Sequence, residues 1–261
     1  KTCIWGQRDA GLLRENKRLE KLAVKNTPNF IANSQTSRSF LVDVLHINPA
    51  KVSIVHNGID LSIRTGGQDG QPSQDLPFGP FTACMVGNIH PNKDHETLIY
   101  AWKKVLDKYP SAELLLAGYV DQAYSQPVCL VKELELSTNV KFLGIVKEIP
   151  GLLKSCQLGI LSSVSEGMPN SVLEYMAACL PVVATDIPAI RDIVGEDYPL
   201  LSPPKDPDCL AEKIIYCIEH PEIAQQIAER NFTRVQSGYS TEVLFQRTMD
   251  VIRNALGKRT K

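Results

Sequence analysis

The sequence predicts an α/β fold, a parallel sheet with helices on both faces. Three observations predict it: short apolar runs recur from residue 81 onward, helical stretches separate these runs, and the runs lack polar–apolar alternation. Strands that are covered on both faces of a parallel sheet are apolar throughout. Strand–helix–strand alternation implies right-handed crossovers, and hence a doubly wound layer.

The strands and helices of this layer follow each other along the chain. Strands are predicted at residues 81–87, 112–118, 139–144, 156–163 and 180–185. Helices are predicted between them, at residues 94–109, 128–136, 148–155 and 170–179. In the first of these helices the apolar Leu98, Trp102 and Val105 recur at the spacing of one helical face.

The flanking segments predict the end of a second α/β unit and a helical C-terminus. Two short strands at 29–34 and 51–60 surround a helix at 35–46, and residues 65–80, rich in Gly, Pro, Gln and Asp, indicate a linker. Residues 206–237 and 240–256 are predicted to be helical. We therefore expect three parts, at residues 1–77, 78–237 and 238–261.

Composition argues against several classes of protein. The formal net charge of -1 provides no positive field for nucleic acid, and no apolar run approaches the length of a transmembrane helix. The seven cysteines form no C-x-x-C pair and none lies at metal-ligand spacing from a histidine. We expect no metal site and a reducing, cytoplasmic location.

The stretch "SSVSEGMPNSVLEYMAACLPVVATD" joins two of the predicted strands through a loop and a helix. Gly167 allows backbone to approach a ligand, Pro169 suits the first turn of a helix, and the free N–H groups from Gly167 to Val172 form an anion site. Glu174, about one turn later, suits a vicinal diol such as ribose, and Glu166 suits a second polyhydroxylated group. A phosphate between two diols describes a nucleotide sugar.

A purely structural interpretation of the two acids competes with this one. Acidic residues near a helix N-terminus complement the helix dipole and contribute about 0.3–1 kcal/mol each. Taken singly, Glu166 and Glu174 fit that explanation. Taken together with the Gly, the Pro and the flanking strands, they favour a ligand site.

"EGMPNSVLE" resembles the E-x7-E motif of retaining glycosyltransferases with the GT-B fold, in particular family 4. The resemblance implies the C-terminal, Rossmann-like half of that fold. It implies that Glu166 contacts the donor sugar, that the backbone after it meets sugar and phosphate, and that Glu174 holds the ribose. The implied donor-binding positions of this segment are Glu166, Gly167, Met168, Pro169, Asn170, Ser171, Val172 and Glu174.

Other segments extend the resemblance over nearly the whole chain. "VGNIHPNKDHETLI" resembles the G-R-L-x-x-x-K segment that binds the donor diphosphate, which adds Gly87, Asn88 and Lys93 to the implied site. "VKFLGIVKEIP" resembles the loop whose backbone lies against the base, which adds Val146. "NSQTSRSFL" and "VSIVHNGID" resemble the end of the N-terminal domain and the entry to its hinge, at Asn57.

Two positions depart from the family pattern. Asn88 stands where the family usually has Arg, and residues 187–189, "IPA", replace a frequent Gly-Gly turn. A hydrogen bond to a charged group contributes about 1.5–3 kcal/mol, so its loss costs roughly ten- to a hundredfold in affinity. Either another cation substitutes, with Arg191 the nearest by motif, or Lys93 and helix N-termini suffice. His90 and His95 are interpreted as loop and helix-surface residues, with a phosphate neighbour as the alternative.

The resemblance implies a retaining, metal-independent glycosyltransferase that moves a sugar from a nucleotide-diphosphate sugar, UDP- or GDP-linked, to a glycan or lipid-linked acceptor. Lys93 and Glu166 are the implied catalytic residues, and no cofactor is expected. The implied roles are polysaccharide or glycolipid biosynthesis in the cytoplasm, or at the inner face of the membrane. Peripheral membrane contact would then be made through the N-terminal domain.

By the same resemblance, residues 78–237 bind the nucleotide sugar, residues 1–77 are the tail of the acceptor domain with its hinge and linker, and residues 238–261 form a helix packing back on that domain. A fragment lacking most of the acceptor domain is expected to be inactive alone. The alternative is a non-catalytic nucleotide-sugar binding or regulatory module. A G-x-G-x-x-G turn and a G-K-[ST] motif are both absent from the sequence, which argues against a dehydrogenase and a P-loop enzyme.

Overall fold

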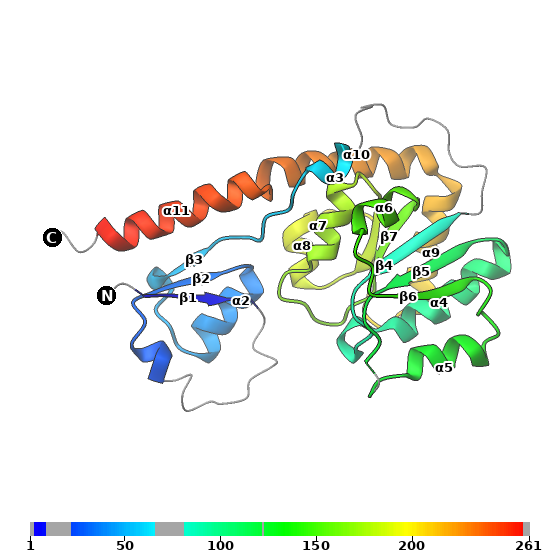
Figure 1. Cartoon of the computed structure of the whole chain (residues 1–261), viewed down its shortest axis with the longest axis horizontal. Helices are drawn as coiled ribbons and strands as arrows, with labels where there is room; N and C mark the ends of the chain where they lie inside the picture. The colour runs from blue at the N-terminus through cyan, green and yellow to red at the C-terminus, as the bar shows by residue number, and fades with distance from the viewer. Residues whose placement is uncertain (1–2, 9–21, 66–80, 122, 258–261) are drawn as a thin grey trace.

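Two parallel sheets lie beside each other in the computed structural model of this protein (Figure 1), which describes residues 3–8, 22–65, 81–121 and 123–257. The larger sheet has the strand order β6-β5-β4-β7-β8-β9. All its neighbouring strands pair in parallel. The strands are β4 (Thr82–Val86), β5 (Glu113–Ala117), β6 (Val140–Gly144), β7 (Leu158–Leu161), β8 (Val182–Thr185) and β9 (Leu201–Ser202).

This strand order reverses between β4 and β7, because the chain adds strands outward on one side and then on the other. A reversal of this kind opens a crevice at the carboxyl ends of the two central strands, where doubly wound sheets bind ligands. The loops that follow β4 and β7, residues 87–94 and 162–169, therefore meet at that crevice. These are the loops that the sequence predicts to carry the site.

Helices cover both faces of the larger sheet, which confirms the predicted fold class. On one face α4 packs against α5 and α9, and on the other α7 packs against α8 and α10. The helices are α4 (His95–Lys108), α5 (Gln126–Glu133), α6 (Ile149–Lys154), α7 (Asn170–Ala177), α8 (Pro188–Val194), α9 (Pro207–Glu219) and α10 (Pro221–Gly238). The segment predicted as helical at 206–237 is two helices, because Pro221 breaks it and starts α10.

Tyr175 of α7 fixes that helix against the two central strands. Its hydroxyl accepts a hydrogen bond from the backbone N–H of Val86 at 2.6 Å and lies 3.3 Å from the carbonyl oxygen of Ile160. A Cβ on Gly159 would stand 2.4 Å from the Tyr175 ring, so this close approach requires glycine. The position of α7 at the crevice is thereby set from within the core.

The smaller sheet has the parallel order β1-β2-β3, with strands β1 (Ile4–Gln7), β2 (Asn29–Ala32) and β3 (Val52–Ile54). The sequence predicts the last two of these strands, whereas β1 is additional. Helix α2 (Gln35–Ser39) continues into a π-helical turn, Phe40–Val44, so the helix predicted at 35–46 is present but changes its type after Ser39. Short helical turns follow at Pro49–Lys51 and in α3, Ser62–Thr65. Residues 66–80 of the predicted linker lie outside the described residues.

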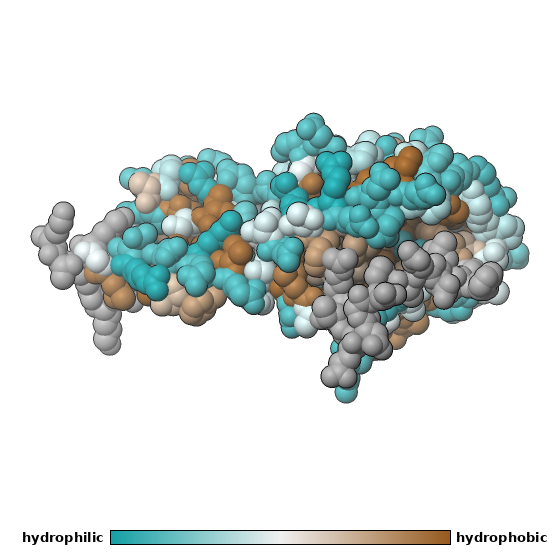
Figure 2. Space-filling model, turned by 90° about the horizontal axis from the view of Figure 1, so that it is seen from above, coloured by the Kyte–Doolittle hydropathy of each residue, from teal (hydrophilic) through white to brown (hydrophobic). Residues whose placement is uncertain are grey.

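The helix predicted at 240–256 is α11 (Thr241–Gly257). It leaves the larger unit and runs over the smaller one (Figure 1). Hydrophobic side chains interrupt the hydrophilic surface where α11 and the smaller sheet lie (Figure 2). Phe245 and Leu256 of α11 are 60% and 54% exposed. In the part of the chain that the structure describes, no helix is both long and apolar enough to cross a membrane.

Candidate functional site

The two loops of the crevice are hydrogen-bonded to each other. The backbone N–H of Val164 donates to the carbonyl oxygen of Asn92 at 2.9 Å. The Ser162 hydroxyl lies 2.9 Å and 3.0 Å from the carbonyl oxygens of Lys93 and Asp94. Asp94 adopts the left-handed conformation with φ 46° and caps α4, because its carboxylate accepts from the backbone N–H of Thr97 at 3.4 Å. The same carboxylate accepts from the Thr97 hydroxyl at 2.8 Å. The backbone of Lys93 is therefore held in place from both sides.

Lys93 and Glu166, the two predicted catalytic residues, form an ion pair across the crevice. Lys93 Nζ lies 2.6 Å from Glu166 Oε1, and the side chains are 23% and 13% exposed. The Ser163 hydroxyl donates to the same carboxylate oxygen at 2.6 Å. The Lys93 side chain passes over Gly87, because a Cβ on Gly87 would stand 3.4 Å from Lys93 Cε. An ammonium with three donor hydrogens keeps two of them for an anion while it holds this carboxylate.

The segment after Glu166 leads into α7, whose first helical residue is Asn170. Pro169 is the N-cap and not a residue of the first turn, which corrects the sequence prediction. No side chain caps this end of α7, so the first-turn N–H groups keep their hydrogen-bonding capacity for an anion. Met168, Ser171 and Val172 are buried, whereas Asn170 is exposed.

Glu174 lies in the middle of α7 and is half-buried. Burial raises the pKa of its carboxyl group above the ordinary value of 4.5. Glu174 takes no part in the Lys93–Glu166 ion pair. The structure thus brings Lys93 and Glu166 together, and leaves Glu174 one turn further along the helix that starts beside them.

Asn88, which stands where the family pattern has Arg, is exposed and ties two loops together. Its side-chain oxygen accepts from the backbone N–H of Tyr119 at 3.1 Å. The neighbouring Gly118 has φ 156°, and a Cβ there would stand 2.1 Å from the carbonyl oxygen of Gly87. The half-buried Val146 follows β6, at the same end of the sheet as these loops.

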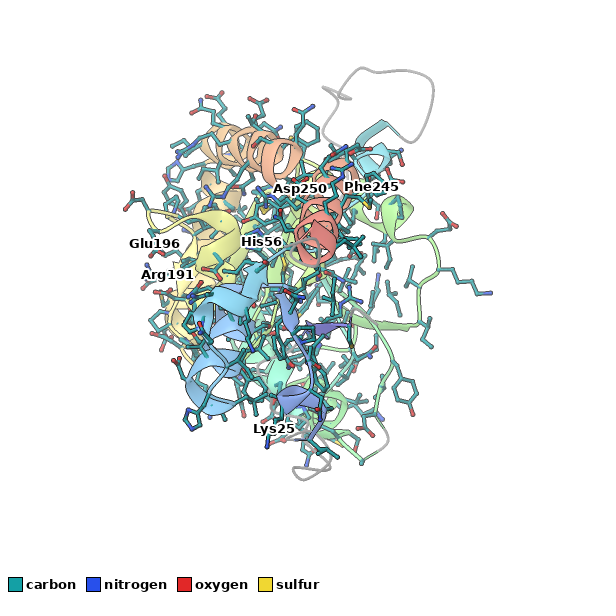
Figure 3. The ribbon with its side chains drawn as sticks, turned by 90° about the vertical axis from the view of Figure 1, so that its left-hand side faces the viewer. Lys25, His56, Arg191, Glu196, Phe245 and Asp250 are labelled. Atoms are coloured by element: carbon teal, nitrogen blue, oxygen red, sulfur yellow. The ribbon has the colours of Figure 1, made fainter. Side chains whose placement is uncertain are left out.

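Arg191 does not replace the missing arginine. Its guanidinium donates to both carboxylate oxygens of Asp186, at 2.5 Å and 2.6 Å, and forms a second ion pair with Glu196 at 3.1 Å. Arg191 and Glu196 lie close together at the outside of α8 (Figure 3). The guanidinium is neutralised by these carboxylates.

The two histidines beside Lys93 have different environments. His90 is exposed and its Nδ1 accepts from the backbone N–H of Asn92 at 3.3 Å. His95, predicted on the surface, is fully buried instead, and neither ring nitrogen has a hydrogen-bond partner among the described residues. Burial, with the positive charge of Lys93, lowers the pKa of His95 to about 3. The signal was present in the sequence, because Leu98, Ile99 and Trp102 follow His95 at the spacing of one helical face.

Three contacts at the site escaped the sequence analysis. Ser162 binds the Lys93 backbone and Ser163 binds the Glu166 carboxylate. Asn57, at the predicted hinge, reaches the segment that is predicted to bind the donor. The Asn57 side-chain N–H donates to the side-chain oxygen of Asn170 at 2.7 Å. Within the described ranges, no three His, Cys, Asp or Glu residues are grouped so that they would hold a metal ion.

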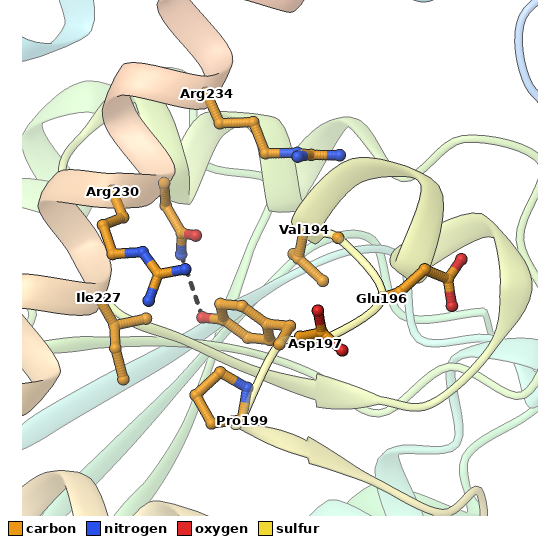
Figure 4. A pocket seen from close by; sticks show the side chains of 10 residues that line it. Val194, Glu196, Asp197, Pro199, Ile227, Arg230 and Arg234 are labelled. Carbon is orange, nitrogen blue, oxygen red and sulfur yellow. Dashed lines mark hydrogen bonds between the residues drawn. The ribbon is translucent and has the colours of Figure 1, made fainter.

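A separate pocket of about 290 Å³ lies between the 194–199 loop and α10 (Figure 4). Arg230, Arg234 and Asn231 form its helical wall. Asn231 donates to the Tyr198 hydroxyl at 3.1 Å, and Arg234 is bound to the carbonyl oxygen of Ile193 at the end of α8 at 2.5 Å. None of the predicted site residues lines this pocket.

Comparisons with known proteins find glycosyltransferases among the relatives of this chain. The chain is 24% identical over 188 residues to an Escherichia coli protein named UDP-Gal:alpha-D-GlcNAc-diphosphoundecaprenol alpha-1,3-galactosyltransferase, covering 70% of this chain and 49% of the relative. It is 28% identical over 184 residues to a Campylobacter jejuni 4-alpha-N-acetylgalactosaminyltransferase that is named for a diphospho-undecaprenol substrate, covering 70% and 48%. The chain thus spans about half the length of these curated relatives.

Solved structures share the fold. The crystal structure of Anabaena HepE in complex with UDP matches with a TM-score of 0.85 and 22% identity, over 97% of this chain and 72% of that one. A sucrose-phosphate synthase from Thermosynechococcus elongatus matches with a TM-score of 0.79, over 95% and 64%. The family described as Glycosyltransferase Family 4 matches residues 2–63, and the family described as Glycosyl transferases group 1 matches residues 70–234. Since the latter match covers more than half of the chain, this protein belongs to the glycosyl transferases of group 1.

Proposed function

We propose that this protein transfers a sugar from a nucleotide-diphosphate sugar to a glycan or lipid-linked acceptor, with retention of the anomeric configuration. The observation that carries the proposal is the Lys93–Glu166 ion pair at the point where the strand order reverses, beside the uncapped start of α7. A cation and free N–H groups at one crevice suit a diphosphate, and a fixed carboxylate suits sugar hydroxyls.

In this proposal the diphosphate is the leaving group, and its developing charge is stabilised by Lys93 and by the first-turn N–H groups of α7. Glu166 accepts hydrogen bonds from the donor sugar and orients it, while Lys93 and Ser163 hold Glu166. Glu174, one turn along, accepts from the ribose hydroxyls. A lysine and fixed backbone dipoles supply the positive charge that a divalent cation supplies elsewhere, so we propose a metal-independent reaction without a cofactor.

UDP is the first donor nucleotide to test, because the matched HepE structures contain UDP or UDP-glucose; GDP is the second. The relatives' names support a lipid-linked acceptor, and with it a cytoplasmic protein at the inner face of the membrane. We further propose that residues 78–237 form the donor domain and that residues 1–77 belong to the acceptor domain. Transfer would require the complete acceptor domain.

The two glutamates separate binding from turnover. Glu174→Ala should weaken UDP binding about ten- to a hundredfold, since a hydrogen bond to a charged group contributes about 1.5–3 kcal/mol. Glu166→Ala should lower the turnover of the full-length protein more than it lowers UDP affinity. Calorimetric titration with UDP and GDP, and a transfer assay with UDP-sugars, measure the two effects. Unchanged titrations for Glu174→Ala, or unchanged turnover for Glu166→Ala, would contradict these roles.

Asn88 favours a second candidate, a nucleotide-sugar binding module without catalysis. The position carries no positive charge, and its side-chain oxygen is occupied by the N–H of Tyr119. Both candidates predict that UDP binds. Transfer or hydrolysis of the donor by the full-length protein decides between them. NMR of the product reads the anomeric configuration. Addition of EDTA to the assay tests whether the reaction is independent of metal ions.

A further inference from the structure

Residues 55–61 follow β3 and connect the two sheets, and they are called the linker from here on. This linker contacts the proposed donor segment directly. From that linker, the backbone N–H of Asn57 lies 3.2 Å from the sulfur of Met168, and its side-chain amide donates to the Asn170 side-chain oxygen at 2.7 Å. Met168 is 8% exposed and belongs to the core of the larger unit, whereas Asn170 is the first residue of α7. Asn57 therefore touches the segment on both sides of Pro169.

The linker is in turn bound to the second crossing between the units, where α10 passes into α11. The N–H of Ile59 donates to the carbonyl oxygen of Tyr239 at 2.8 Å, and the N–H of Thr241 donates to the carbonyl oxygen of Ile59 at 3.2 Å. A Cβ on Gly58 would stand 2.8 Å from Leu244 Cβ and 3.0 Å from the carbonyl oxygen of Ser240. The linker and the junction of α10 with α11 are in close contact, so a shift of one requires a shift of the other.

His56, the residue before Asn57, also contacts the segment where α10 passes into α11. The His56 ring lies 5.2 Å from the ring of Tyr239, and its Nδ1 is 3.4 Å from a guanidinium nitrogen of Arg247 on α11. In Figure 3, His56 lies between α8 and α11. A change in the orientation of the smaller unit and α11 therefore displaces the linker at the residue that binds the start of α7.

We propose that Asn57 is a positioning residue that couples the orientation of the two units to the geometry of residues 166–170. The inference rests on the proposed function, because it assigns the donor diphosphate to the start of α7. A ligand at this segment favours one orientation of the units, and that orientation strengthens the binding of the ligand by the same factor. Asn57 acts through Met168 and Asn170 and need not touch the donor.

A double-mutant cycle in the full-length protein tests the coupling, with UDP as the probe in calorimetric titrations. Asn57→Ala and Asn170→Ala should each weaken UDP binding about two- to tenfold, the contribution of one hydrogen bond. The double variant should be no weaker than the weaker single variant, because both substitutions remove the same bond. Losses that multiply in the double variant would overturn the inference.

Two further variants separate positioning from general damage. Asn57→Gln should bind UDP more tightly than Asn57→Ala, because its uncharged side-chain amide can still donate to the Asn170 side-chain oxygen. Asn254→Ala removes an exposed asparagine of α11 and should change nothing. Loss of UDP affinity in Asn254→Ala equal to that in Asn57→Ala would contradict the role of the hydrogen bond.

Small-angle X-ray scattering measures the radius of gyration, and its response to UDP would not change if Asn57 had only a structural role. Saturating UDP should change the radius of gyration of the wild-type protein, and this change should be lost in Asn57→Ala at saturating UDP. A change of equal size in both proteins would overturn the coupling. If the wild type binds neither UDP nor GDP, both the proposed function and this inference fail. If the wild type binds UDP and the double-mutant cycle shows no coupling, only this inference fails.

Discussion

The six-stranded and the three-stranded sheets bury very different amounts of apolar surface. The larger unit encloses side chains such as Trp102 and Tyr175 completely, between helices on both faces of its sheet. Among the residues that the structure describes, the core of the smaller unit contains Val24, Phe30, Ala32, Leu41 and Val52. Because stability follows buried apolar area, the larger unit should fold by itself, whereas the smaller one depends on its neighbours.

The contacts of the smaller unit with the rest of the molecule support this view. The N–H of Gln35, at the start of α2, donates to the Asp192 carboxylate of α8 at 3.2 Å. Further contacts join Asn57 to Asn170 of α7 and Ile59 to Ser240. The predicted donor residues lie in the larger unit, and Asn57 lies at the boundary. We therefore expect that mutations can change the stability of the two units separately.

Matched Leu→Ala substitutions in the two cores should show the largest difference between the two units. Leu98 and Leu41 are both 0% exposed, one in each unit, and Leu→Ala at such positions costs about 2–5 kcal/mol. Leu98→Ala should destabilise the larger unit and weaken UDP binding. Leu41→Ala should unfold the smaller unit earlier in urea and leave UDP binding unchanged. The two tryptophans report separately, since Trp5 lies in β1 and Trp102 in α4.

Fluorescence in Trp5→Phe and Trp102→Phe backgrounds resolves the two unfolding transitions. Coincident transitions in every variant would show that the two units unfold as one cooperative body. The larger unit would then not be the more stable of the two.

Loss of the Lys93 charge should have the next largest effect, on turnover rather than on stability. Lys93→Met should lower the turnover of the full-length protein about 10²–10³-fold, as the loss of one stabilising donor does in other enzymes. The free energy of unfolding should change little, since a partly exposed ion pair contributes about 0–1 kcal/mol. The matched control is Lys104→Met, which removes an exposed ion pair between α4 and Asp208 of α9. Equal turnover in the two variants would remove Lys93 from the mechanism.

The pH dependence of stability should show a smaller effect, specific to the larger unit. The pKa of His95 is lowered to about 3 in the folded protein, so between pH 6.5 and pH 3 the unfolded state binds a proton that the folded state does not. The free energy of unfolding therefore falls with decreasing pH in this window, by up to about 1.4 kcal/mol per unit. His95→Leu should flatten this dependence in urea titrations at pH 6.5 and 5. Identical slopes for the two proteins would contradict the assignment.

The larger unit could be predicted from sequence because its strands are uniformly apolar and its helices periodic. All five predicted strands are present as β4 to β8. Two strands escaped prediction: β1 is four residues long and contains Gly6, and β9 has only two residues. Gly6 interrupts the apolar pattern of β1, and β9 is too short to show a pattern. Pro221 marks the break in the helical segment at 206–237.

The site was predictable in part for a different reason. Lys93 and Glu166 are 73 positions apart, and no periodicity relates them. Their contact follows from the resemblance and from the pairing of β4 with β7, whose loops share one crevice. The burial of His95 and the contact of Asn57 with Met168 and Asn170 depend on tertiary packing, which no local pattern records. The division into domains at residues 77 and 237 stays a prediction.

A crystal structure of the protein with UDP tests the central claim most directly. The account predicts a diphosphate oxygen within hydrogen-bond distance of Lys93 Nζ, the first turn of α7 against the phosphates, and the ribose beside Glu174. UDP bound elsewhere, for example at Arg230 in the pocket between the 194–199 loop and α10, would contradict it.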